Sequence, residues 1–123
     1  RCSLNPQLEE ADQLLAAGQR DRTAFRILRR DAESPAEITL FHAQQAAEKF
    51  IKAVLALRGV TYRRTHDLVE LNELVTQDRV AIPVARELLV RLGPYAVEFR
   101  YLGVKAPEVS LEEAESAIDA LLA

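Results

Sequence analysis

Residues 40–59 read Leu-Phe-His-Ala-Gln-Gln-Ala-Ala-Glu-Lys-Phe-Ile-Lys-Ala-Val-Leu-Ala-Leu-Arg-Gly, and this stretch decides the fold class. Its apolar residues recur every three or four positions, which is the spacing of one buried face of an α-helix. Just upstream, Ser34-Pro35 followed by Glu37 is typical of a capped helix start, and Gly59 is typical of a helix end. The stretch therefore predicts one long helix with a buried face. The residues assigned to that face are Phe41, Ala47, Phe50, Ile51, Val54 and Leu55.

The same helical spacing recurs along the rest of the chain. Start signals for four more helices lie at Asn5-Pro6, Thr65, Pro83 and Ser110. Gly93-Pro94 interrupts the fourth helical pattern and predicts a kink or break, because proline lacks a backbone donor and crowds the preceding turn. No segment alternates with period two for long enough to be a strand, and no linker or repeat divides the chain. Residues 1–123 are therefore predicted to form a single all-α bundle of about five helices.

The composition is that of one globular domain. The 123 residues are 49% hydrophobic and 28% charged, a balance that supports a packed core. The net charge of −3 excludes a wholly basic nucleic-acid coat, so a contact with nucleic acid must come from a local patch. No apolar run reaches the roughly 20 residues that span a bilayer, and no secretory signal is recognisable, so a cytoplasmic location is expected.

The sequence lacks the residues that most kinds of catalytic site require. The lone Cys2 excludes an internal disulfide, and with two histidines it cannot form a zinc site of the usual composition. The four glycines are scattered, which excludes a phosphate-cradling glycine-rich loop, and no serine lies in a nucleophile elbow. We therefore expect no metal and no cofactor.

A polar stripe follows the helix predicted in residues 40–59. His42, Gln45, Lys49 and Lys52 are spaced by three and four positions, so they share an arc of roughly 80° on the helix surface. Such a stripe could line a groove that accepts phosphate. Alternatively, it is an ordinary solvated face on which Glu48 and Lys52 form an i,i+4 pair.

A basic segment lies on the loop before the third predicted helix. Arg58, Arg63 and Arg64 precede His66, and no acidic residue lies between Arg58 and His66. An imidazole at a helix start beside guanidinium groups suits general acid–base cleavage of a phosphodiester, with the arginines neutralising the phosphate. His66 is thus the candidate catalytic residue, with Arg64 beside it.

The same segment also admits a structural interpretation. Thr65 can cap the helix that follows, and His66 and Asp67 can fill its first turn, where a carboxylate suits the positive end of the helix. Asp67 can also hold the loop by hydrogen-bonding a neighbouring group. Spacing alone leaves both interpretations open.

Three motifs in the chain resemble a known family. Residues 41–53, Phe-His-Ala-Gln-Gln-Ala-Ala-Glu-Lys-Phe-Ile-Lys-Ala, are followed by Thr65-His66-Asp67-Leu68 and later by Glu98-Phe99-Arg100-Tyr101. Together they resemble the HEPN domain family (higher eukaryotes and prokaryotes nucleotide-binding) over essentially the whole chain. The resemblance implies a compact up-and-down bundle, frequent homodimerisation and, in prokaryotes, a minimal nucleotidyltransferase encoded alongside. Many such pairs act as toxin–antitoxin systems in which the HEPN partner is often a metal-independent ribonuclease.

The catalytic signature of those ribonucleases is absent from this chain. It consists of an arginine, four to six intervening residues and a histidine. For His66 the arginine would lie at positions 59–61, and for His42 at positions 35–37, but neither range contains one. Arg58 misses the required spacing by one residue. The chain is therefore interpreted as a nucleotide- or RNA-binding or regulatory module of the toxin–antitoxin type, working with a minimal nucleotidyltransferase.

Two alternatives stay open. One is an atypical metal-independent ribonuclease that uses His66 with Arg64 or Arg58, and the other is a purely structural dimerisation domain. The resemblance and the two clusters of polar residues assign nucleotide or RNA binding to His42, Gln45, Lys49, Lys52, Arg58, Arg63, Arg64, Asp67, Arg100 and Tyr101.

A homodimer is expected on physical grounds as well, because a short helical bundle rarely covers all of its apolar side chains. Leu88, Leu92, Tyr95 and Phe99 recur at helical spacing. The helix that carries them is predicted to be shared between the core and the dimer interface.

Overall fold

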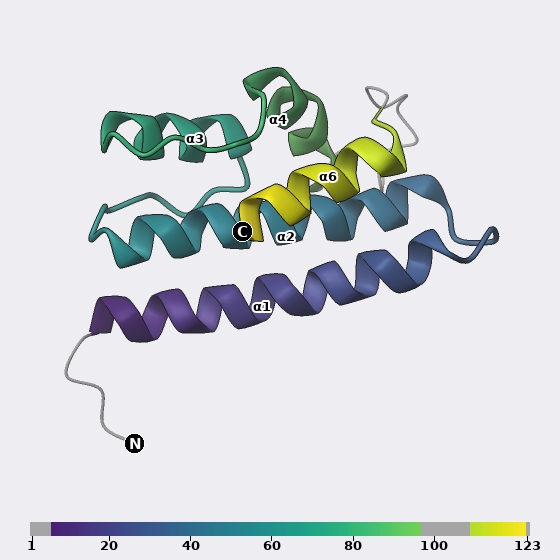
Figure 1. Cartoon of the computed structure of the whole chain (residues 1–123), viewed down its shortest axis with the longest axis horizontal. Coiled ribbons are helices and arrows are strands. Elements are labelled where there is room, and N and C mark those ends of the chain that lie inside the picture. Colours follow the sequence, from purple (N-terminus) through teal and green to yellow (C-terminus); the bar gives the residue numbers. More distant parts are fainter. Residues whose placement is uncertain (1–5, 97–108, 123) are drawn as a thin grey trace.

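The computed structural model describes residues 6–96 and 109–122, and in these ranges it contains helices and no strands. Figure 1 shows two long antiparallel helices side by side, with most of the shorter helices packed on the second of them. The predicted all-α, up-and-down bundle of about five helices is confirmed. The α-helices are α1 (Pro6–Arg29), α2 (Ala36–Leu57), α3 (Leu68–Gln77), α4 (Arg86–Leu92) and α6 (Leu111–Leu122), and η1 (Gly93–Ala96) is a 3-10 helix.

Helix α2 is the centre of the bundle. It packs against α1, α3, η1 and α6, and its apolar residues form the middle of the core (Figure 1). This follows from the sequence, because α2 carries apolar residues on more than one side and can cover several neighbours. Of the face predicted from spacing, Ala47, Phe50, Ile51 and Leu55 are buried, whereas Phe41 and Val54 are half-buried.

Helices α1 and α2 approach closely at Gly18. A Cβ atom on Gly18 would lie 2.6 Å from Cε1 of the buried Phe50, so a side chain at this position would push the helices apart. Ala11 and Phe25 lie seven residues to either side of Gly18 and are buried on the same face of α1. The contact holds the polar residues of α1 against α2 and against the loop that follows it.

The break predicted near Pro94 is confirmed. Helix α4 ends at Leu92, and residues 93–96 continue as the 3-10 helix η1. Helix α4 begins at Arg86, three residues later than the Pro83 start signal predicted. Leu92 and Tyr95, which were predicted to be shared with a dimer partner, are buried in the core of this chain, and Phe99 lies outside the described residues.

The helix caps differ in part from those that the sequence predicted. At the start of α2, the capping box of Ser34 and Glu37 does not form, and the hydroxyl of Ser34 lies 2.9 Å from that of Thr39 instead. At the end of α2, Gly59 has the predicted left-handed conformation with φ of 71°. Helix α3 is capped by Asp67 and not by Thr65, because the Asp67 carboxylate accepts hydrogen bonds from two backbone N–H groups of the first turn.

The cap predicted for the last helix is confirmed. The Ser110 hydroxyl accepts a hydrogen bond from the backbone of Glu113, and the Glu113 carboxylate accepts one from the backbone of Ser110. Arg91 also binds that carboxylate, and these hydrogen bonds lower the pKa of Glu113 to about 2. The cap therefore fixes α6 against α4.

Candidate functional site

The polar stripe on α2 faces α1. The Nδ1 atom of His42 lies 3.0 Å from Oδ1 of Asp21, and the ammonium group of Lys49 pairs with the other oxygen of the same carboxylate. The side chain of Asp21 is only 14% exposed. His42 and Lys49 are thus held between the two helices, and they do not form an ordinary solvated face.

Glu48 connects the stripe to the loop before α3. Its side chain is 4% exposed, and a buried carboxylate requires partners that compensate for its lost hydration. The ammonium of Lys52 lies 2.9 Å from Oε2, and Nδ1 of His66 lies 2.8 Å from Oε1. The predicted Glu48–Lys52 pair therefore forms, but inside the molecule and with the imidazole as a second partner.

Two glutamines complete this arrangement. The side-chain amide of Gln44 donates to Oε1 of Glu48 and to the backbone carbonyl of His66. Gln45 donates in turn to the side-chain oxygen of Gln44. The amides thus tie the start of α3 to the middle of α2, and they orient Glu48 toward His66.

His66 is held at one ring nitrogen, and its side chain is 57% exposed. A carboxylate on Nδ1 favours the tautomer that carries its proton there, which leaves Nε2 of the neutral ring as an acceptor. This relation between a carboxylate and an imidazole suits general acid–base chemistry at Nε2. Asp67, next along the chain, uses its Oδ1 atom to cap α3.

The loop arginines have different surroundings. Arg58 binds Asp78 at the end of α3, and Arg63 binds the carboxylate of Glu70 through two of its nitrogens. Arg64 makes no ion pair with any residue that the structure describes. The loop therefore does not bring all of its guanidinium groups together beside His66.

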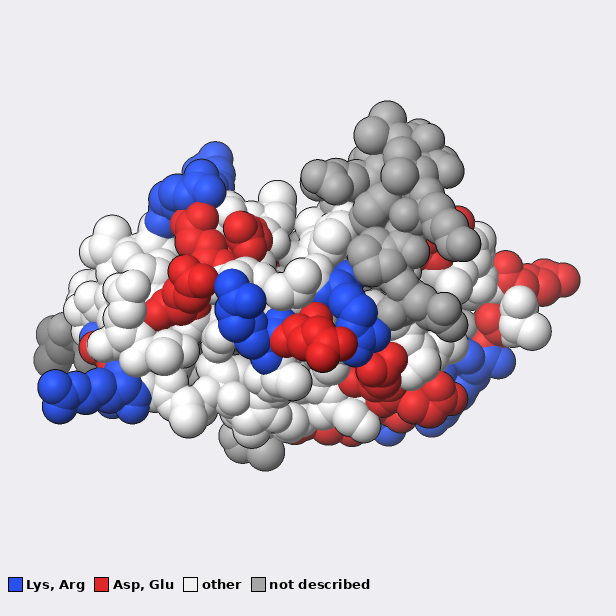
Figure 2. Space-filling model, turned by 90° about the horizontal axis from the view of Figure 1, so that it is seen from above, with Lys and Arg blue, Asp and Glu red and all other residues white. Residues whose placement is uncertain are grey.

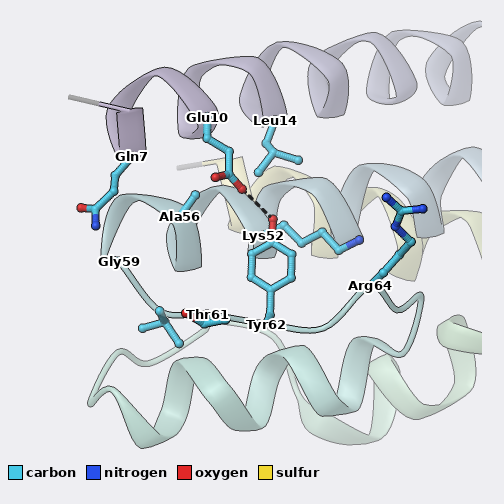
Figure 3. A pocket seen from close by; sticks show the side chains of 10 residues that line it. Gln7, Glu10, Leu14, Lys52, Ala56, Gly59, Thr61, Tyr62 and Arg64 are labelled. Carbon is cyan, nitrogen blue, oxygen red and sulfur yellow. Dashed lines mark hydrogen bonds between the residues drawn. The ribbon is translucent and has the colours of Figure 1, made fainter. Parts of the chain in front are cut away.

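Arg64 lines a cavity of about 560 Å³ between α1, α2 and the loop. Figure 3 shows the amino group of Lys52 pointing toward the end of this cavity where Arg64 lies. The Lys52 ammonium also lies 5.7 Å from the centre of the Tyr62 ring, which is within the range of a cation–π contact. Two cationic groups thus converge on one end of the cavity.

Tyr62 forms the wall of the cavity facing α1. Its hydroxyl donates a hydrogen bond of 3.0 Å to Glu10, drawn as the dashed line in Figure 3. Burial, this hydrogen bond and the nearby charges of Glu10 and Glu48 raise the pKa of Tyr62 to about 12. Tyr62 is therefore a neutral hydrogen-bond donor at physiological pH.

His66 lines a different cavity, of about 500 Å³, together with residues of α4 and η1. Leu89, Val90 and Pro94 make part of its wall apolar, and Thr65 and Asp67 add polar groups next to His66. The candidate catalytic pair, His66 and Arg64, therefore faces two cavities. Glu48 connects them, because it binds both His66 and the Lys52 of the first cavity.

The face formed by α3, α4 and α6 carries no broad basic patch among the described residues. Figure 2 shows that acidic and basic side chains alternate across this face. The ion pairs there include Arg63–Glu70, Arg86–Glu73 and Arg91–Glu113. A contact with nucleic acid on this side would therefore rest on local groups and not on a one-signed surface.

Several features of the site escaped sequence reasoning. Asp21, Glu10 and Tyr62 were not singled out, because their partners lie 21 or more residues away in sequence. Glu48 had a detectable signal: it occupies the helical row of Gln44, Ile51 and Leu55, so that a charge stands among core positions. Arg100 and Tyr101, predicted to bind nucleotide, lie outside the described residues.

None of the helices in residues 6–96 and 109–122 is long and apolar enough to cross a membrane. Within the same ranges, no three or more histidine, cysteine, aspartate and glutamate side chains are grouped to hold a metal ion.

Comparisons with known proteins identify the family. No curated protein and no solved structure matches the chain. Residues 11–121 match the HEPN domain, which covers most of the 123 residues. The match includes α2, the loop before α3 and all of the cavity-lining arginines and histidines described above. The chain therefore belongs to the HEPN domain family.

Proposed function

We propose that this HEPN domain binds a nucleotide or single-stranded RNA through its phosphate groups, at the cavity that Arg64 and Lys52 line. The observation that carries the proposal is the convergence of their two cationic groups, one of which has no ion-pair partner among the described residues. A guanidinium group binds phosphate with two parallel hydrogen bonds, and an ammonium adds a point charge. Tyr62 offers a polar or stacking contact at the same cavity.

Removing the Arg64 guanidinium is expected to weaken binding. For Arg64→Ala we expect the Kd for a short fluorescein-labelled single-stranded RNA to rise about tenfold or more, because hydrogen bonds between charged groups contribute roughly 1.5–3 kcal/mol. The slope of log K against log salt should fall by about one. Fluorescence anisotropy titrations at several salt concentrations measure both quantities.

The matched control is Arg79→Asn, which removes one positive charge from an exposed position outside the cavity. Asparagine suits the positive φ of 62° at this position, so the control should fold normally. Its Kd should stay within about threefold of wild type, as expected for a distant screened charge. Equal losses in both variants would contradict a site at Arg64, and no saturable binding by wild type would favour the purely structural alternative.

The proposal extends to a partner protein. The motifs in residues 41–53 and 65–68, together with the missing ribonuclease signature, support a regulatory role beside a minimal nucleotidyltransferase in a cytoplasmic toxin–antitoxin system. A stable complex after co-expression with a nucleotidyltransferase encoded next to this chain would support this part. Separate elution of the two proteins would count against it.

A second function, metal-independent RNA cleavage, is favoured by the hydrogen bond between Glu48 and His66. If His66 is the general acid–base group, His66→Ala should slow cleavage by roughly 10²- to 10⁴-fold, and chelator should leave the wild-type rate unchanged. The comparison variant is His42→Ala, since Asp21 holds that imidazole between α1 and α2. Gel analysis of a labelled RNA measures the rates. Intact RNA with wild-type protein, or equal loss in both variants, would exclude this function.

A further inference from the structure

An acidic side chain lies among the basic ones at the cavity of Arg64. Glu10 of α1 lines this cavity together with Lys52 and Arg64. A carboxylate repels phosphate, because two negative charges close together raise each other's energy. Phosphate binding at Arg64 therefore gives Glu10 no role, although Glu10 lines the same space.

Tyr62 holds Glu10 in place. Its hydroxyl donates a hydrogen bond of 3.0 Å to Oε2 of Glu10. A carboxylate has about four acceptor positions on its two oxygens. Glu10 makes no ion pair with a residue that the structure describes, and none of these residues donates to its Oε1 atom. Glu10 can therefore accept further hydrogen bonds from a ligand while Tyr62 fixes its position.

The carboxylate lies between two different ends of the cavity. Figure 3 shows Glu10 and Tyr62 in the middle, with Leu14 adding apolar surface beside Glu10. Arg64 lies toward one end and Gln7 toward the other (Figure 3). The volume of about 560 Å³ is within the range of roughly 300–1,000 Å³ that small-ligand sites occupy. A ligand whose phosphate lies at Arg64 thus has room for a ring beside Glu10.

The four RNA bases differ in what their Watson–Crick edges offer to a carboxylate. Guanine presents two adjacent donors, N1–H and the N2 amino group, and a carboxylate can accept both in parallel hydrogen bonds. Adenine and cytosine place a ring-nitrogen acceptor next to their amino group, and uracil places its N3–H between two carbonyl oxygens. A carboxylate repels each of these acceptors. Glu10 therefore favours guanine over the other three bases.

We propose that this cavity binds a guanine nucleotide, with Glu10 accepting hydrogen bonds from N1–H and the N2 amino group while Arg64 and Lys52 bind the phosphate. The inference rests on the proposed phosphate site and adds the base to it. Tyr62 is a positioning residue, because its hydroxyl binds the Glu10 carboxylate. A free guanosine monophosphate and a guanosine within single-stranded RNA share this chemistry.

Isothermal titration calorimetry with nucleoside monophosphates tests the base preference. Wild-type protein should bind guanosine monophosphate about tenfold or more tightly than adenosine monophosphate, since adenine cannot make either hydrogen bond to the carboxylate. Inosine monophosphate lacks only the N2 amino group and should bind with intermediate affinity. Anisotropy with a labelled oligouridylate that contains one guanosine distinguishes the two sources: tighter binding than the mononucleotide indicates RNA, and weaker binding indicates the free nucleotide.

Glu10→Gln removes the charge and keeps an acceptor for Tyr62. We expect its Kd for guanosine monophosphate to rise about tenfold, whereas its Kd for adenosine monophosphate should stay within about threefold of wild type. The matched control is Glu9→Gln, which makes the same change at the neighbouring exposed residue of α1, outside the cavity. It should leave both constants within about threefold. Tyr62→Phe keeps the ring and should reduce the preference for guanine about threefold, because Glu10 loses its hydrogen bond.

Three results would overturn the proposal. Equal affinities of wild type for the guanine and adenine nucleotides would show that Glu10 does not read the base. Equal tightening of both nucleotides by Glu10→Gln would mean that the carboxylate only repels phosphate, and equal weakening would mean that it only holds Tyr62. The phosphate site is judged separately, because Arg64→Ala should weaken both nucleotides by the same factor whichever base is preferred.

Discussion

The variant Glu48→Ala is expected to lower the free energy of unfolding by roughly 3–5 kcal/mol, which is the range for breaking a buried ion pair by removing one partner. Lys52 is only 13% exposed, so its ammonium would lose a compensating charge without gaining full hydration. The amide of Gln44 would also lose an acceptor. Urea denaturation followed by circular dichroism measures the change.

Two companion variants test whether the unpaired charge of Lys52 causes the loss of stability in Glu48→Ala. Glu37→Ala removes an exposed carboxylate from the first turn of the same helix, and it should change stability by less than about 1 kcal/mol. Glu48→Leu combined with Lys52→Met removes both charges and should recover part of the loss, because no unpaired charge then remains. A loss below about 1 kcal/mol for Glu48→Ala would mean that water compensates the Lys52 ammonium, and that Glu48 does not hold the loop.

The second large loss of stability is expected for Gly18→Val. Its side chain would meet the ring of Phe50, and overpacking of this kind costs about 1–3 kcal/mol, with the upper part of the range expected here because both residues are buried. Ala16→Val is the matched control, since it also adds a β-branched side chain to α1 but at an exposed position. That control should lower the free energy of unfolding by less than about 1 kcal/mol, which is the range of helix propensities.

A double variant shows whether the ring causes the loss. Phe50→Leu leaves more space opposite residue 18, so Gly18→Val/Phe50→Leu should lose less stability than the sum of the two single variants. Thermal denaturation of wild type, the two single variants and the double variant gives the coupling free energy between residues 18 and 50. Additive losses would show that the close approach of α1 and α2 at Gly18 does not set the helix spacing.

The helices could be predicted closely because their signals are local. The apolar spacing of α2, its end at Gly59 and the break at Pro94 depend on residues within one or two helical turns. The helix starts were less predictable, because neighbouring polar groups compete for the same backbone donors. Thus Asp67 took the capping position that Thr65 was expected to fill.

The candidate site could be predicted only in part. The stripe on α2 and the basic loop were recognisable by residue type, and His66 was recognised as the imidazole of interest. Their partners were not, because pairs such as His42 with Asp21 join residues on different helices. Whether Arg58, Arg63 and Arg64 share a pocket likewise depends on where Asp78 and Glu70 lie after folding.

The amino-acid sequence by itself determined the all-α class, the number and approximate limits of the helices and the family to which the chain belongs, since these depend on periodicity and on motifs of adjacent residues. Only the tertiary structure decided that Glu48 is buried between Lys52 and His66, and that Arg64 and His66 line separate cavities. The physical reason is that burial and ion pairing depend on distances between segments far apart in sequence. Those distances are set by how the helices and the loop before α3 pack.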